Sequence, residues 1–212
     1  TVTNAPCQEI VLTGQDADLN ILPALKCWPL DAGRFITLPL VITQDPQSKR
    51  RNVGIYRMQI HSATTAGLHW QTHKVGAGHY RTADTRKQDN MEVAVALGGD
   101  PATIWSGSMP LPPDMDEIGV AGFIRRESVD MVKCISVDLE VPAQAELVLE
   151  GTIPYDMKHP EGPFGEWTGY YAAPLKDEPI IKVENILYQL DCNIFYHLDE
   201  QQQQYLQALF QV

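Results

Sequence analysis

One short segment of the chain carries two acids among aromatic residues. Residues 160–171 read PEGPFGEWTGYY, which places Glu161 and Glu166 five positions apart. The Gly162-Pro163 pair and Gly165 favour a turn or loop over a helix. Apolar rings beside a carboxyl raise its pKa, and two carboxyls in different surroundings can divide into an acid and a base or anchor. The alternative is a loop whose acids are solvated and whose aromatic side chains cover the edge of a core.

A second candidate for chemistry is Arg57. Residues 52–62 (NVGIYRMQIHS) are predicted to form a strand, and its alternation puts Arg57 on the same face as Val53 and Ile55. That face is the apolar one, and an inward arginine is costly unless it is paired. The alternative is a partly exposed arginine whose aliphatic stem covers the core.

Two histidines lie four positions apart in a predicted strand over residues 67–73 (GLHWQTH). An even spacing on a strand puts His69 and His73 on one face. The sequence is not HExxH and lies on no obvious helix, so a zinc protease is excluded. The spacing by itself is not specific for a metal site.

Composition limits the classes of function. The 212 residues hold 16 Lys and Arg against 27 Asp and Glu, a formal net charge of -11 that disfavours binding to a phosphate backbone. No apolar run approaches the roughly 20 residues of a membrane span, and the N-terminus lacks the order of a signal peptide. The scattered cysteines have no CxxC spacing and are predicted to be reduced thiols of a cytoplasmic protein: Cys7, Cys27, Cys134 and Cys192.

Strands outnumber helices in the pattern of the chain. Apolar or alternating runs predict strands over residues 9–14, 35–43, 52–62, 67–73, 91–97, 145–153 and 179–190. A surface helix is predicted over 80–88, and Asp100 with Pro101 is typical of a helix start. The sequence therefore predicts a mainly β (α+β) fold, a closed or split β-barrel with a few peripheral helices. Residues 1–190 are expected to form this domain, and residues 191–212 a tail of helical composition.

Five stretches, in this order, resemble the UbiD family of reversible decarboxylases. They are NVGIYRMQ (52–59), ALGGDPA (96–102), DEIGVAGFIRRE (116–127), VKCISVDLEVPAQAELVLEGTI (132–153) and EGPFGEWTGYY (161–171). The resemblance covers nearly all of residues 5–190. It implies the split β-barrel of the flavin-reductase-like type that forms the centre of these enzymes. Family members are about twice this length and carry an α/β domain on each side of the barrel.

The resemblance also implies a set of site residues. Arg57, Glu161 and Glu166 match the catalytic Arg–Glu–Glu set, and the family uses prenylated FMN. A divalent cation, Mn²⁺ or Mg²⁺, links to the cofactor phosphate, and its ligands match Asn52, His73 and Glu117. A carbonyl oxygen, an imidazole nitrogen and a carboxylate oxygen suit such an ion better than thiolates would. Potassium is often bound nearby.

Two consequences follow for these residues. Glu166 would have to be protonated to deliver a proton to the substrate carbon, and flanking by Phe164 and Trp167 would favour that form. Asn52 and Arg57 fall on opposite faces of a regular strand, so a strand end or bulge near Gly54 is predicted.

The function implied is reversible, non-oxidative decarboxylation of an aromatic or α,β-unsaturated carboxylic acid. The alternatives are a non-catalytic barrel that binds flavin or a partner chain, a flavin reductase, and a plain structural domain. No dinucleotide fingerprint supports the reductase. Self-association is left open by the sequence.

Overall fold

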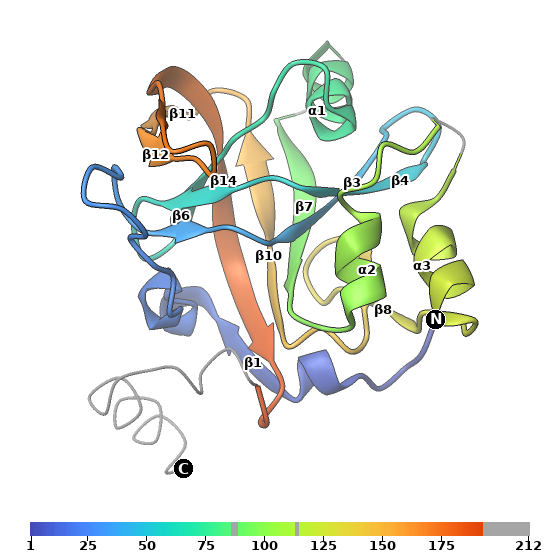
Figure 1. Cartoon of the computed structure of the whole chain (residues 1–212). Coiled ribbons are helices and arrows are strands. Elements are labelled where there is room, and N and C mark those ends of the chain that lie inside the picture. Colours follow the sequence, from blue (N-terminus) through green and yellow to red (C-terminus); the bar gives the residue numbers. More distant parts are fainter. Residues whose placement is uncertain (86–88, 113–114, 193–212) are drawn as a thin grey trace.

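A ten-stranded antiparallel sheet forms the centre of the protein (Figure 1). The computed structural model describes residues 1–85, 89–112 and 115–192. The path through the sheet is β2-β5-β6-β14-β10-β7-β3-β4, and both β1 and β11 pair with β14. Helices are few, so the predicted mainly β class is confirmed. The predicted helical tail over 191–212 lies, from residue 193 onward, outside the described residues.

The strands of this sheet are β1 (Ile10–Thr13), β2 (Phe35–Ile36), β3 (Leu40–Gln44), β4 (Arg51–Ile55), β5 (Met58–Ile60), β6 (Thr65–Leu68), β7 (Asn90–Leu97), β10 (Leu147–Pro154), β11 (Lys158–Glu161) and β14 (Leu175–Tyr188). Two small hairpins pair β8 (Met131–Lys133) with β9 (Glu140–Pro142) and β12 (Phe164–Gly165) with β13 (Tyr171–Ala172). The α-helices are α1 (Val75–Thr85), α2 (Pro101–Ser106) and α3 (Glu117–Arg125), and short 3-10 helices cover Pro6–Gln8, Gly14–Asp16 and Leu19–Ile21.

The sheet curls without closing. Its path ends at β2 and β4, and among the described strands no pairing joins these two. Of the two predicted forms, a closed and a split β-barrel, the structure therefore has the split form. Two of the predicted strands are each divided in two. Pro39, which has no N–H to donate, separates β2 from β3, and Tyr56 with Arg57 separates β4 from β5.

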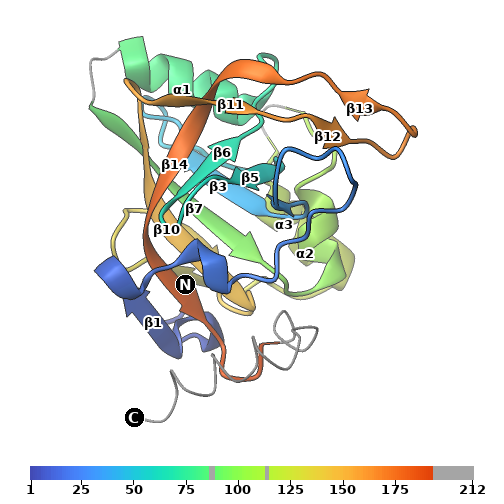
Figure 2. The same ribbon diagram turned by 90° about the vertical axis from the view of Figure 1, so that its left-hand side faces the viewer.

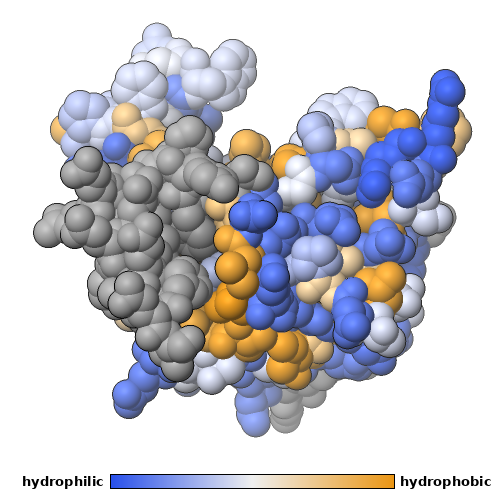
Figure 3. All heavy atoms as spheres, turned by 90° about the horizontal axis from the view of Figure 1, so that it is seen from below, coloured by the Kyte–Doolittle hydropathy of each residue, from blue (hydrophilic) through white to orange (hydrophobic). Residues whose placement is uncertain are grey.

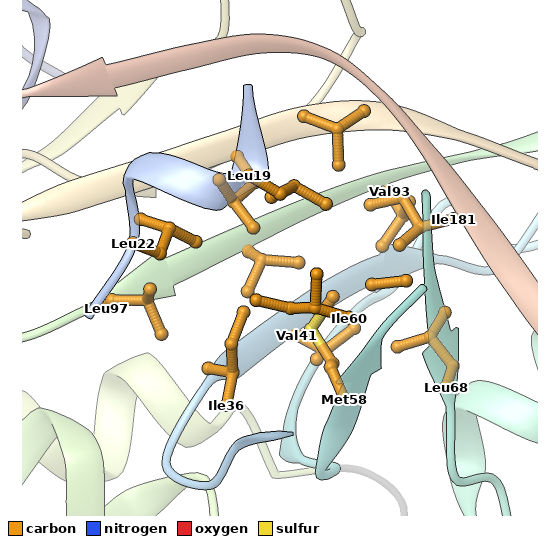
Figure 4. Packing of buried hydrophobic residues seen from close by; sticks show 14 of the residues in the cluster. Leu19, Leu22, Ile36, Val41, Met58, Ile60, Leu68, Val93, Leu97 and Ile181 are labelled. Atoms are coloured by element: carbon orange, nitrogen blue, oxygen red, sulfur yellow. The ribbon is translucent and has the colours of Figure 1, made fainter. Parts of the chain in front are cut away.

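The central strands are apolar on both faces because each face is covered. Val41 and Val93 point into a core enclosed by the curled sheet (Figure 4), and Val95 belongs to the same cluster. Their neighbours in sequence, such as Ile42 and Ala94, belong to a second core on the outer face. That outer core also holds residues from β8, β9 and α3. This double burial explains why residues 35–43 and 91–97 read as nearly continuous apolar runs rather than as alternating ones.

Acidic caps fix the starts of α2 and α3, and the one at Asp100 confirms the helix start that the sequence predicts. The Asp100 carboxylate accepts from the backbone N–H groups of Ala102 and Thr103 at 3.0 and 3.1 Å. The Asp116 carboxylate accepts from Ile118 N–H at 2.9 Å. These two helices contact each other, and α3 also contacts β4. The α1 helix contacts β3, β4 and β7 (Figures 1 and 2). The predicted helix over 80–88 thus begins earlier, at Val75, and residues 86–88 lie outside the described part.

Hydrophilic and hydrophobic side chains are unevenly distributed over the surface. Seen from below, most of the coloured face is hydrophilic, with one larger hydrophobic patch in the lower middle and smaller ones elsewhere (Figure 3). Within the described residues, no helix combines the length and apolar character that a membrane crossing needs.

Candidate functional site

Arg57 lies between two strands rather than inside one. β4 ends at Ile55 and β5 begins at Met58, so Tyr56 and Arg57 leave the regular alternation. A side-chain carbon at Gly54 would overlap the Tyr56 ring, so glycine lets that ring fold back over β4. The predicted strand end near Gly54 is confirmed. Because the strand ends at Ile55, the alternation of a strand no longer determines which way the Arg57 side chain points.

The Arg57 guanidinium bridges both acids of the 160–171 segment. Its Nε and Nη2 donate to Oε1 and Oε2 of Glu161 at 2.8 and 3.1 Å, a bidentate pairing. Its Nη1 donates to Oε1 of Glu166 at 3.0 Å. The guanidinium carbon lies 4.5 Å from the centroid of the Phe164 ring. The Arg57 side chain is only 10% exposed. The prediction that Arg57 is buried and paired is therefore confirmed, and the alternative of a partly exposed arginine is wrong. The predicted face is also wrong, because Arg57 lies outside the strand that carries Val53 and Ile55.

Glu161 is a fully buried anion at the end of β11. Burial by itself would raise the pKa of Glu161, but hydrogen bonds from His69 and Arg57, together with the guanidinium charge, outweigh burial and lower this pKa to about 2. The carboxylate is consequently ionised at neutral pH. The bidentate pairing therefore makes Glu161 the fixed anchor of Arg57.

His69 is a member of this cluster that sequence reasoning did not place there. Its Nδ1 lies 3.2 Å from Oε2 of Glu161 and 3.3 Å from Nη2 of Arg57, and its backbone N–H donates to Arg57 O at 3.1 Å. The prediction of one strand over 67–73 is wrong, because β6 ends at Leu68. His69 and His73 consequently do not share a strand face, and only His69 reaches the Arg57 cluster.

Glu166 is held differently from Glu161. It follows β12 in the turn to β13, and its backbone N–H donates to Tyr170 O at 2.8 Å. Its side chain is 38% exposed. The expected enclosure by flanking aromatic rings is wrong for Trp167, which is 94% exposed on the turn. Phe164 alone of the two flanking rings packs inward, with its centroid 4.7 Å from that of Phe35.

Two further polar side chains support the cluster. Gln59 Oε1 accepts from Gly162 N–H at 2.9 Å, where the glycine has a φ of +80°. Glu178 Oε2 accepts from Trp70 N–H at 3.1 Å, and burial raises the pKa of Glu178. Gln59 belongs to the YRMQ stretch and could have been suspected. Glu178 could not, because nothing in the sequence links β14 to this loop.

Of the three predicted metal ligands, Asn52 and Glu117 lie near each other, because Glu117 bonds the backbone of the residue that follows Asn52. Glu117 Oε2 accepts from the backbone N–H of Val53, the residue after Asn52, at 3.3 Å. Burial raises the pKa of Glu117. Asn52 is buried, and its Nδ2 donates to the Tyr56 hydroxyl at 3.3 Å.

His73 lies on an exposed turn that leads into α1. The first turn of that helix reaches the same place, because Gly76 N–H donates to the Tyr56 hydroxyl at 3.5 Å. In the part of the chain that the structure describes, no hydrogen bond joins His73 to Asn52 or Glu117. No group of three or more His, Cys, Asp and Glu side chains suited to a metal is found there either. Asn52 is not of these residue types, so the predicted set of Asn52, His73 and Glu117 contributes only two side chains to such a group.

The whole described fold matches known proteins. Residues 1–198 match the family described as UbiD, 3-octaprenyl-4-hydroxybenzoate carboxy-lyase Rift-related domain. A protein of Archaeoglobus fulgidus is 47% identical over 193 residues, which is 91% of this chain and 39% of the relative. A protein of Synechocystis is 45% identical over 179 residues, 84% of this chain and 35% of the relative.

Two solved structures are similar to the described fold. The UbiD-class enzyme HmfF from Pelotomaculum thermopropionicum, in an evolved dimeric form in complex with prFMN, has a TM-score of 0.82 and 31% identity. The match covers 87% of this chain and 42% of HmfF. The vanillic acid decarboxylase of Sedimentibacter hydroxybenzoicus in closed form has a TM-score of 0.83 and 29% identity, over 89% of this chain and 42% of that enzyme. The chain thus spans about two fifths of these relatives, and with the match over residues 1–198 it belongs to the UbiD family.

Proposed function

We propose that this chain is the part of a UbiD-type enzyme that removes carbon dioxide from an aromatic or α,β-unsaturated carboxylic acid, reversibly and without net oxidation. The observation that carries the proposal is the nearly buried Arg57 guanidinium bridging Glu161 and Glu166. Prenylated FMN is proposed as the cofactor because the similar HmfF structure holds prFMN. When bound, this cofactor supplies the electron sink for cleavage of the carbon–carbon bond.

Glu161 and Glu166 have different roles in this proposal. Glu161, with its pKa lowered to about 2, stays ionised and keeps Arg57 in a fixed orientation. Two of the guanidinium nitrogens donate to Glu161, whereas Nη1 is bonded to the more exposed Glu166. When the Glu166 side chain moves aside, Nη1 of Arg57 is therefore the nitrogen that donates a hydrogen bond to the substrate carboxylate.

Glu166 is the proposed proton carrier. Loss of carbon dioxide leaves the substrate carbon with an electron pair, and that carbon takes the proton of the Glu166 carboxyl group. Glu166 then becomes a carboxylate, which pairs with Arg57 as in this structure. Its side chain is 38% exposed, so a proton from solvent can restore the acid. The reverse sequence carboxylates the substrate.

We propose that Asn52, His73 and Glu117 hold Mn²⁺ or Mg²⁺ against the phosphate of the cofactor, with K⁺ nearby. The donor atoms are those that such ions prefer, and Glu117 accepts from the backbone N–H of Val53, the residue after Asn52. His73 lies on the turn into α1, whose Gly76 N–H reaches the Tyr56 hydroxyl beside Asn52. The ion would supply positive charge to a phosphate on a chain whose net charge is -11.

The test is expression of the chain together with an enzyme that makes prenylated FMN, in the presence of manganese. Absorption and mass spectra after desalting report cofactor retention, and release of carbon dioxide from a panel of aromatic and acrylic acids reports turnover. Glu117→Gln should lower retention, whereas Glu127→Gln should not, because Glu127 is an exposed acid just beyond the far end of α3. Glu166→Gln should retain cofactor and abolish release.

Each other result has a defined meaning. Retained cofactor with no turnover of any acid favours a barrel that binds flavin without catalysis. Oxidation of NADH favours a flavin reductase. A folded chain that retains no cofactor contradicts the proposal.

A further inference from the structure

A segment far from the acidic loop in sequence holds the hairpin that carries Glu166. This segment, residues 28–35, ends at the first residue of β2 and contacts β12 and the residues before β12. Asp31 Oδ1 accepts from Gly165 N–H at 2.7 Å, and Ala32 N–H donates to Pro163 O at 2.9 Å. The hairpin therefore has anchors outside itself.

Asp31 is the charged centre of these anchors. It is only 3% exposed, and both its carboxylate oxygens accept backbone hydrogen bonds. Besides Gly165 N–H on Oδ1, Trp28 N–H donates to Oδ2 at 2.9 Å. Hydrogen bonds to an ionised acceptor are roughly twice as strong as neutral ones. One buried carboxylate thus ties the 28–35 segment to the residue directly before Glu166.

The hairpin needs such an anchor because it is short. β12 and β13 have two residues each, and an isolated two-stranded hairpin is marginal in water. A side-chain carbon at Gly165 would overlap the Trp28 ring, so the backbone lies directly against that ring. The position of β12 is consequently set by contacts from the 28–35 segment.

Glu161 has a different support. It ends β11, which pairs with β14 inside the large sheet, and the Glu161 side chain is fully buried. Its place does not depend on the hairpin. We propose that Asp31 is a positioning residue that holds Glu166 against Arg57, and that it does not position Glu161. The catalytic part of this inference rests on the proposed function, whereas the positional part does not.

The positional part is tested by hydrogen exchange in the full chain. Asp31→Asn keeps the shape but can accept only one of the two backbone bonds, because its amide nitrogen is a donor. A lost bond to a charged acceptor should speed exchange of Gly165 N–H about tenfold to a hundredfold. Asp31→Ala, which loses both bonds, should speed it further. The Glu161 carboxyl should titrate as in the original chain.

Glu150→Gln is the matched control. Glu150 is also a fully buried carboxylate that accepts from backbone N–H groups, those of Ile135 and Ser136, at 2.9 and 2.7 Å. These residues follow β8, which lies on the opposite side of the molecule from β12 (Figure 1). This variant should loosen its own loop and leave exchange at Gly165 unchanged.

The catalytic part is tested with an acid that the cofactor-loaded chain decarboxylates. Asp31→Asn should lower kcat about tenfold or more while KM changes little, because Arg57 still binds the substrate carboxylate. Unchanged exchange at Gly165, or a raised KM with unchanged kcat, overturns the inference. If the original chain turns over no acid, the proposed function fails, and faster exchange at Gly165 still supports the positional part.

Discussion

Replacing Glu161 by glutamine should remove one of the largest single electrostatic contributions to the stability of the site. Glu161 is fully buried and accepts two hydrogen bonds from Arg57 and one from His69. Glu161→Gln keeps the size of the side chain but removes the charge that compensates the guanidinium. The Arg57 side chain is only 10% exposed, so it cannot regain full hydration without moving.

The pKa of Glu161 gives the magnitude. A fall from 4.5 to about 2 on folding corresponds to about 3 kcal/mol at neutral pH, at about 1.4 kcal/mol for each pH unit. Because the pKa is lowered in the folded state, this contribution is complete above the unfolded pKa of 4.5. It is lost as the pH falls towards 2, and about 1.4 kcal/mol remains at pH 3.

Urea unfolding at pH 7, 5 and 3 measures this dependence. The difference between the original chain and Glu161→Gln should be about 3 kcal/mol at pH 7 and at pH 5, and should fall to about half or less at pH 3. Glu184→Gln, at an exposed acid on the adjoining strand β14, should change stability by less than about 0.5 kcal/mol. A loss below about 1 kcal/mol for Glu161→Gln, or a difference that does not shrink in acid, would refute the reasoning.

Two further predictions concern residues that contact the site. His69→Ala should raise the pKa of Glu161 above about 2, because it removes a hydrogen bond that lowers this pKa, and carboxyl NMR titration should detect the change. His73→Ala, in metal-free protein, is the control that should leave the titration unaltered. Gly165→Ala should cost about 1–3 kcal/mol in urea unfolding, because its methyl group overlaps Trp28. Gly78→Ala in α1 should instead stabilise by up to about 1 kcal/mol, because only Arg81 Nη2, at 4.0 Å, lies near the added carbon. Equal effects of the two glycine changes would contradict the packing argument.

Most strands could be predicted from the sequence because burial on both faces leaves long apolar runs. Residues 91–97 and 145–153 correspond closely to β7 and β10. The predicted helix start at Asp100 is equally local, since a cap needs only its own next residues. Local chemistry also indicated that a strand would end near Gly54.

The sequence could nominate Arg57, Glu161 and Glu166 by type, spacing and family resemblance. It could not show that one guanidinium lies between acids 104 and 109 residues away, because that pairing depends on how β5 and β11 are brought together. The aromatic enclosure expected for Glu166 was wrong for the same reason. A turn decides which rings point inward, and this one turns Trp167 to solvent.

His69 and Asp31 show the limit most clearly. The sequence pattern puts His69 on one strand face with His73, but β6 ends one residue before His69, which lies beside Glu161. Asp31 follows Pro29 by two residues in a stretch without periodicity, and its partner Gly165 is 134 residues away. Residue types and their local order determined the elements and the chemistry available. Only the tertiary structure decided which charges are buried together, because burial and pairing are properties of segments distant in the chain.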